Sequence, residues 1–260
     1  MARPSSVSWS RRTRPAVSSA ATVVVAVGWE QGTRAAMAPI RIGCSSAISS
    51  NAMNCVGCSV EGPPICARCA TRLDARLEAA AGVPIGLPGD LPAPLLQLEW
   101  CAPFHGVIRD ALHAIKYGGE QRLAEPLGRA IARRWARVGV GADLVTHVPV
   151  HADRARQRGY DQAELIARSA ARHLGLPYAP LLTRQRATIA QFDLDRRDRA
   201  ANVEGAFAVT AVSAAAEPRG RWVLLIDDVL TTGATIAACA KALEAAGALA
   251  ASGVTVARER

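Results

Sequence analysis

Aromatic residues and lysine are scarce in this sequence. Only 4% of the 260 residues are Phe, Trp or Tyr, so a core must be built mainly from Ala, Val, Leu and Ile. The same scarcity leaves few rings for stacking on bases, which counts against sequence-independent binding of single-stranded nucleic acid. Lys116 and Lys241 are the only lysines among 31 basic residues, and the preference for Arg and Ala indicates a GC-rich coding sequence and not a function.

A run of apolar residues long enough to span a membrane is also missing, since none reaches about 18 residues. The best candidate, residues 16–28, follows three Arg and has the pattern of a secretory signal. We favour a disordered or untranslated extension over residues 1–50, because no small-x-small cleavage site precedes Trp29 and both Met37 and Met53 are plausible starts. We therefore expect a cytoplasmic protein without a membrane span.

The basic surplus gives little indication of a nucleic-acid partner. The net charge is +9, but residues 1–50 hold six Arg and one Glu and so carry +5 of it. The remaining +4 is spread over 210 residues, which is weak evidence for a nucleic-acid interface.

Four of the seven cysteines form two C-x-x-C pairs, Cys55 with Cys58 and Cys66 with Cys69. Each pair lets two thiolates face one tetrahedral ion, and two pairs make a closed site of the structural Zn²⁺ type. A closed site has no open coordination position, so it stabilises the fold and does not catalyse. A redox pair or chance spacing is the alternative. The other cysteines are expected to be a bystander or buried small apolar residues: Cys44, Cys101 and Cys239.

The order of apolar patterns predicts an α/β protein. We expect a four-cysteine knuckle and short helix over residues 51–81, a proline-rich linker over 82–94 and one domain over 95–260. Alternating strands and helices imply a mostly parallel sheet covered on both faces. Helices are expected over residues 70–81, 106–115, 123–138, 164–174 and 235–246, and strands over 144–150, 222–226 and 253–257.

The segment from residue 223 to 235 combines a buried strand, two carboxylates, a turn of small residues and a helix. Asp227 and Asp228 end the apolar run, and adjacent acids at a strand end can hold ribose hydroxyls directly or through Mg²⁺. The turn at 231–235 places backbone N–H groups and hydroxyls at a helix N-terminus, where a phosphate binds favourably, and Gly233 permits close approach. An ordinary strand–turn–helix explains only one Asp and one Thr.

This segment resembles the signature that binds 5-phosphoribosyl-1-pyrophosphate (PRPP) in type I phosphoribosyltransferases. Together with the paired cysteines, several further motifs are similar to the ComF family of competence-associated phosphoribosyltransferase-like proteins, over about residues 55–260. These motifs are Phe104-His-Gly106, Ile115-Lys116-Tyr117-x-Gly119, Val148-Pro149-Val150, Arg158-Gly159-Tyr160-Asp161-Gln162, Thr188-x-x-Gln191 and Arg199-x-x-Asn202-x-x-Gly205-Ala-Phe207.

The resemblance implies the type I phosphoribosyltransferase fold and roles for individual residues. Asp227 and Asp228 would hold the ribose 2′ and 3′ hydroxyls, with Mg²⁺ as cofactor. The 5′-phosphate would be cradled by Thr231, Thr232, Gly233, Ala234 and Thr235.

Two further segments are implied to border PRPP. Residues 149–159 would form a pyrophosphate-side loop that begins at Pro149, although its arginines also fit a solvated face. Residues 184–205 would form a hood that excludes water during the reaction. The candidate contacts in and beside these segments are Lys116, Arg154, Arg156, Arg158, Gln191 and Arg199. The chain departs from the family's usual Phe-Asn at Tyr160-Asp161.

Three functions stay open at this point. The first is an enzyme that transfers phosphoribose from Mg–PRPP to an unidentified nitrogen nucleophile. The second is a non-catalytic accessory protein of DNA uptake that contacts single-stranded DNA or a competence helicase. The third is a PRPP-sensing regulator. The sequence does not specify the acceptor or the oligomeric state.

Overall fold

The computed structural model describes residues 54–82, 91, 93–185, 205–210 and 217–259. These described residues belong to one compact unit built on a four-stranded parallel sheet. This arrangement confirms the predicted α/β class. The strands follow the spatial order β1 (Leu95–Pro103), β6 (Ala250–Arg258), β5 (Trp222–Leu230) and β2 (Leu144–His147).

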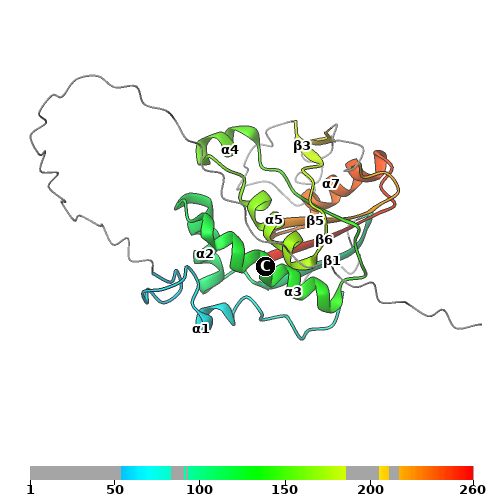
Figure 1. Cartoon of the computed structure of the whole chain (residues 1–260). Helices are drawn as coiled ribbons and strands as arrows, with labels where there is room; N and C mark the ends of the chain where they lie inside the picture. Colours follow the sequence, from blue (N-terminus) through cyan, green and yellow to red (C-terminus); the bar gives the residue numbers. More distant parts are fainter. Residues whose placement is uncertain (1–53, 83–90, 92, 186–204, 211–216, 260) are drawn as a thin grey trace, which may run out of the picture. The chain divides into compact units, whose positions relative to one another are not determined.

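Helices or a small ribbon cover each face of the sheet (Figure 1). One face carries α2 (Gly106–Tyr117), α3 (Ala124–Val138) and α5 (Gln162–Leu174). The other carries α7 (Ala234–Ala245) and an antiparallel ribbon of β3 (Leu182–Arg184) and β4 (Phe207–Val209).

Alternate residues of the central strand serve the two cores. In β5, Leu224 and Ile226 pack with α3 and α5, whereas Val223 and Leu225 pack with α7. All four side chains are fully buried, which explains why the strand is continuously apolar. The aliphatic and alanine-rich composition therefore supplies two thin cores, as the scarcity of aromatic residues predicts.

The bounds of three strands differ from the sequence-based expectation, and the one expected over residues 253–257 begins three residues earlier, at Ala250. The strand expected over residues 144–150 ends at His147, and the one expected over 222–226 continues to Leu230. The longer strand is sustained by β6, whose Arg258 pairs with Leu230. Sequence patterning underestimated β5 because Asp227 and Asp228 interrupt its apolar run although the backbone ladder continues through them.

The helix predicted over residues 70–81 is wrong in its extent, because α1 covers only Ala67–Ala70 and is followed by turns. Within this stretch the backbone forms successive turns with i→i−3 hydrogen bonds, such as those from Leu73 to Ala70 and from Ala79 to Arg76, and other backbone groups bond to the sheet and to α3. The N–H of Arg76 donates to the carbonyl of Cys101 on β1 at 3.1 Å.

Arg134 of α3 holds the same stretch from the other side. Its guanidinium, 1% exposed, donates to the carbonyls of Arg76 and Ala79, at 2.6 Å each, and to that of Ala80 at 3.1 Å. It also donates twice to Oε2 of Glu99 on β1, at 2.6 and 3.1 Å. These long-range bonds from a buried charge pair hold the stretch as a series of turns, where the amphipathic pattern predicted a regular helix.

Candidate functional site

The two adjacent acids lie where two neighbouring strands cease to run together. β2 pairs with β5 only as far as His147 opposite Ile226, and β5 continues beyond that point beside β6 alone. Asp227 and Asp228 are the next two residues of β5. Their position at the carboxyl end of a parallel sheet is the usual place for a ligand in open α/β folds.

A turn and a helix follow the acids directly. Thr231 is exposed and Thr232 half-buried, and Gly233 takes a φ of 81°, a left-handed conformation that favours glycine. α7 begins at Ala234, so the N–H groups of its first turn face the same end of the sheet as the acids. The structure therefore brings all the residues of the predicted phosphate loop into one turn, from Thr231 to Thr235.

Asp228 is held by two donors from distant elements. Its side chain is 9% exposed, and Oδ2 lies 3.0 Å from Nζ of Lys116 at the end of α2. The same oxygen accepts a hydrogen bond of 2.8 Å from Nε2 of Gln162 at the start of α5. Lys116, a predicted contact, therefore lies beside Asp228. Gln162 also contacts Asp228, although the sequence motif that contains it indicated no role for it.

The surroundings of Asp227 disfavour the ionised form of its carboxyl group. Burial and the neighbouring carboxylate of Asp228 raise the pKa of Asp227 well above its usual range, and the N–H of Asp228 and the charge of Lys116 only partly oppose the shift. A carboxylate pair of this kind is stabilised by hydroxyl donors or a cation, which is the chemistry that a ribose diol with Mg²⁺ would supply.

A cationic cleft of about 640 Å³ opens beside the acids, between the end of α2 and α4 (Ala152–Arg158). Its lining brings together three of the predicted cationic contacts and no acidic residue. The lining residues are Lys116, Tyr117, Gly119, Arg154, Gln157, Arg158 and Tyr160.

The predicted pyrophosphate-side loop is largely helical, which is a correction. Residues 152–158 form α4, which His151 caps by accepting a hydrogen bond from the N–H of Asp153, and Gly159 ends it in the left-handed region with a φ of 78°. Arg154 and Arg158 line the cleft, whereas Arg156 pairs with Asp153 on the surface. The signal that was overlooked is Gly159, a typical residue after a helix C-terminus.

Both oxygens of the Asp161 carboxylate accept hydrogen bonds from backbone N–H groups, while its negative charge still acts on Asp227. Its Oδ1 caps α5 by accepting from the N–H groups of Ala163 and Glu164, and Oδ2 accepts from the N–H of Val150. His147 lies 3.6 Å from the same Oδ2, and burial lowers the pKa of this histidine. An Asn at position 161 would direct one donor at a backbone N–H, so the carboxylate suits this arrangement better.

Three predicted contacts cannot be placed at the site. Gln191 and Arg199 lie outside the described residues, as does most of the expected hood. Pro149 is buried just after β2 and does not line the cleft.

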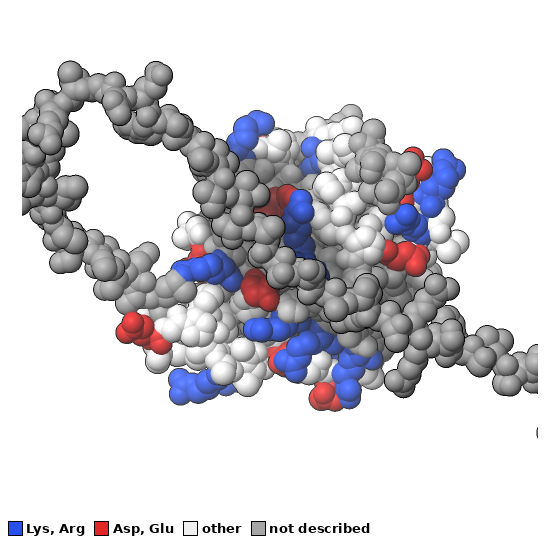
Figure 2. All heavy atoms as spheres, in the orientation of Figure 1, with Lys and Arg blue, Asp and Glu red and all other residues white. Residues whose placement is uncertain are grey.

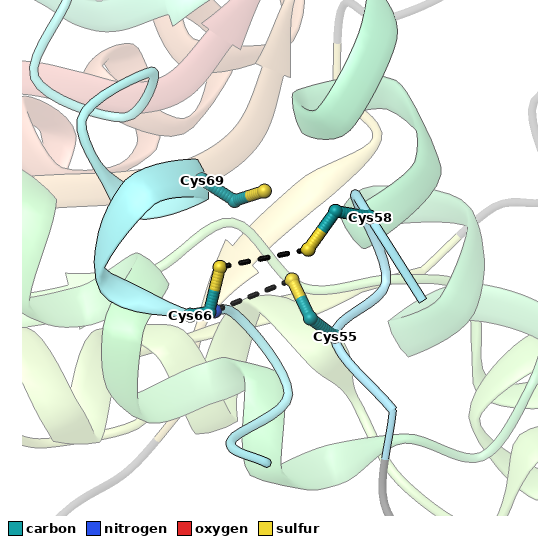
Figure 3. Close-up of side chains that lie close together, drawn as sticks. All are labelled: Cys55, Cys58, Cys66 and Cys69. Atoms are coloured by element: carbon teal, nitrogen blue, oxygen red, sulfur yellow. Dashed lines mark hydrogen bonds between the residues drawn. The ribbon is translucent and has the colours of Figure 1, made fainter. Parts of the chain in front are cut away.

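The four cysteines of the two C-x-x-C pairs converge on one point, with their sulfur atoms directed toward one another (Figure 3). All four Sγ atoms lie within 4.8 Å of one another, and those of Cys58 and Cys66 are 3.7 Å apart. Zn–S bonds of about 2.3 Å place tetrahedral sulfurs about 3.8 Å apart. The cluster therefore fits one tetrahedral ion, which favours a metal site over the redox alternative.

The protonation of the cluster also suits a metal. Burial opposes ionisation of Cys55, but hydrogen bonds from the N–H groups of Cys66, Gly57 and Cys58 outweigh it and lower the pKa of this thiol to about 6. Burial and contact with the other thiols raise the pKa of Cys69 to about 12. Cys55 is thus a thiolate at neutral pH, whereas Cys69 requires the charge of an ion to deprotonate.

The cysteine cluster is part of the main core and not an appended module. Cys55, Cys69 and Leu73 pack in the same cluster as Ile108 of α2. A Cβ on Gly57 would lie 2.7 Å from the side chain of Val107, so only glycine allows this close approach to α2. The cysteine cluster therefore supports the helix whose last turn carries Lys116.

Comparison with known proteins identifies the family of the chain. Residues 161–260 match the family described as phosphoribosyl transferase domain. The DNA utilization protein YhgH of Escherichia coli strain K12 is 30% identical over 200 residues, which are 72% of this chain and 85% of that protein. The chain belongs to the ComF family of phosphoribosyltransferase-like proteins.

Two other similarities are more limited. Competence protein F of Haemophilus influenzae is 36% identical to this ComF-family chain over 106 residues, 40% of this chain and 45% of that protein. A solved glutamine PRPP amidotransferase from B. subtilis, complexed with ADP and GMP, is 22% identical with a TM-score of 0.35, covering 51% of this chain and 26% of that one. This last likeness is too distant to carry an argument about the site.

Proposed function

We propose that this ComF-family protein binds Mg–PRPP and transfers its phosphoribosyl group to a nitrogen nucleophile. The observation that carries the proposal is the juxtaposition at one sheet end of Asp227 and Asp228, the Gly233 turn before α7, and a cleft lined by three cations. These features match the diol, the 5′-phosphate and the pyrophosphate of a single ligand.

The reaction would need charge stabilisation and no covalent nucleophile. The bond from ribose C1 to the pyrophosphate oxygen breaks and its electron pair leaves with pyrophosphate. The acceptor nitrogen forms the new bond to C1 and then loses its proton. Arg154, Arg158 and Lys116 would stabilise the leaving charge, and Asp227 and Asp228 would hold the ribose hydroxyls. Bound Mg²⁺ would neutralise phosphate oxygens.

Replacing both acids with alanine is expected to weaken binding of Mg–PRPP about 100-fold or more, since each hydrogen bond to a charged group contributes roughly a factor of ten. Titration calorimetry of the wild type and of Asp227→Ala/Asp228→Ala measures the loss. Glu244→Ala removes an exposed carboxylate of α7 and serves as the control. Wild-type affinity in the double variant would reject the site, and no binding by the wild type would reject the proposed function.

We propose zinc as the ion of the four-cysteine cluster. Four thiolates at tetrahedral spacing form a closed set that suits Zn²⁺ and leaves no position for a reacting water. The role is structural, because the cluster packs in the core beneath α2 and lines no part of the cleft. Free thiols of this kind also suit a reducing compartment such as the cytoplasm.

A second candidate function is DNA handling without catalysis, which the names of the relatives YhgH and competence protein F favour. On the face seen in Figure 2, acidic and basic side chains are interspersed, and on α3 Arg133 and Arg137 are paired with Asp74 and Glu78. The described part of the chain also has no helix that is long and apolar enough to span a bilayer. Because these arginines of α3 are paired with acids, a DNA-binding role would centre on the cationic cleft or on a helicase partner.

Salt dependence distinguishes direct DNA binding from the enzyme reading. If the second candidate holds, a labelled single-stranded oligonucleotide should bind at about 50 mM salt and lose at least tenfold in affinity by about 200 mM. Fluorescence anisotropy measures this loss. Failure to bind even at the lower salt concentration would eliminate direct contact with DNA.

A further inference from the structure

Gln162 joins the two halves of the proposed PRPP site. Its side chain is 3% exposed and uses both ends of the amide. Nε2 donates to Oδ2 of Asp228 at 2.8 Å, and Oε1 accepts from a terminal nitrogen of Arg158 at 2.7 Å. A continuous chain of hydrogen bonds thus runs from an arginine of the cleft to a carboxylate at the strand end.

The chemistry of the partners permits only one orientation of this amide. A guanidinium can only donate and an ionised carboxylate can only accept, so the oxygen of Gln162 must face Arg158 and its nitrogen must face Asp228. Gln therefore matches both neighbours at once. Glu would place a second negative charge beside Asp228, and Leu would remove both bonds and leave Asp228 with its ion pair to Lys116.

The backbone around Gln162 is fixed on both sides. Asp161 caps the first turn of α5, and Gly159 ends α4 after Arg158. The guanidinium of Arg158 also lies over the ring of Tyr117, 5.1 Å from its centroid. With one nitrogen on Gln162 and its plane over Tyr117, Arg158 has a defined direction from which its other N–H groups can address the cleft.

We propose that Gln162 is a positioning residue that couples Arg158, on the pyrophosphate side, to Asp228, on the ribose side. This role rests on the proposed function and specifies how its two subsites act as a unit. Gln162 does not touch the ligand. It keeps Asp228 and Arg158 in the geometry that one molecule of PRPP requires, so each subsite binds best while the other is in place.

A double-mutant cycle on the affinity for Mg–PRPP tests the coupling. Gln162→Leu and Arg158→Met are each expected to weaken binding about tenfold or more. The loss in the double variant should be clearly smaller than the product of the two single losses, because part of each loss acts through the bond that joins the two residues. Gln121→Leu removes the amide of an exposed glutamine on the neighbouring turn, and it should bind as the wild type does.

A pH profile separates positioning from simple support of the fold. In Gln162→Glu, a protonated carboxyl group can donate to Asp228 and accept from Arg158 as the amide does, whereas the ionised form cannot. Binding by this variant, relative to the wild type at each pH, should recover as pH falls from about 8 toward about 5. Gln162→Leu should show no such recovery.

The outcomes are distinguishable. Additive losses in the cycle, wild-type affinity in Gln162→Leu, or a flat relative profile for Gln162→Glu would each overturn the role of Gln162 in a protein that binds PRPP. If the wild type itself does not bind Mg–PRPP, the proposed function fails and this role fails with it.

Discussion

Replacing Glu99 with alanine should lower the free energy of unfolding by about 3–5 kcal/mol, the usual cost of removing one partner of a buried charge pair. Glu99 and Arg134 are each 1% exposed, and the guanidinium donates twice to the carboxylate. Without Glu99, the positive charge of Arg134 stays buried with only backbone carbonyls as partners. Urea denaturation should show a lower midpoint with an unchanged slope.

A surface pair provides the control for this measurement. Glu78 is 73% exposed and pairs with Arg137. Arg137 lies on α3, about one turn beyond Arg134. Glu78→Ala should cost less than about 1 kcal/mol, because solvent screens exposed pairs. A loss in Glu99→Ala no larger than that of the control would contradict the argument. If Glu99→Ala does not fold, Glu99→Gln keeps the shape and hydrogen-bonding oxygen and should fold with a smaller loss.

Replacing Cys55 with serine should reduce the metal content from about one ion per chain to none and destabilise the whole compact unit. A structural zinc contributes on the order of 10 kcal/mol in small zinc-dependent peptides, so the loss here is expected to reach several kcal/mol. The effect should not stay local, because Cys55 packs in the same core as Ile108 and Leu112 of α2. Metal analysis and a thermal melt with and without chelator measure the two effects.

Cys239 is the matched control for the metal site. It is also a fully buried free thiol, but it lies in the core on the other face of the sheet. Cys239→Ala should keep the metal and cost only the small loss from removing one buried atom. Freshly purified wild type without metal, or metal retained in Cys55→Ser, would contradict the closed site.

The affinity of the cysteine cluster for a metal ion should also depend on pH. Metal binding requires thiolates, so protons compete with the ion. Because the pKa of Cys55 is about 6, this ligand is ionised above that value and becomes protonated as pH falls below it. Metal affinity, and the stability that depends on it, should therefore decrease as the solution is acidified through about pH 6.

Residues close together in the sequence were the easiest to predict. The acids, the turn and the helix start from Asp227 to Thr235 are consecutive, so local chain geometry alone brings them together. The two C-x-x-C pairs are nearly as local, since Cys55 and Cys69 are joined by a short turn-rich segment. The alternation of apolar runs was likewise sufficient to predict a parallel sheet between two helical layers.

Contacts between distant segments were not predictable in the same way. Gln162 meets Asp228 across 66 positions, and nothing in either local sequence indicates the other. Arg134 and Glu99, 35 positions apart, look like ordinary helix and strand charges until the fold buries them together. The extent of β5 and the loss of the expected helix over residues 70–81 have the same origin, because backbone partners from elsewhere decide them.

The sequence by itself therefore determined the family resemblance, the α/β class, the run of acids, turn and helix start from Asp227 to Thr235, and the four-cysteine cluster. Each of these depends on residue types at short, regular spacing, where covalent geometry limits the possible arrangements. Only the tertiary structure decided that Lys116 and Gln162 both contact one oxygen of Asp228. It also decided that the carboxylate of Asp161 accepts hydrogen bonds from backbone N–H groups, and that the cysteine cluster lies in the core under α2. Those arrangements depend on the packing of whole elements, which only the complete fold specifies.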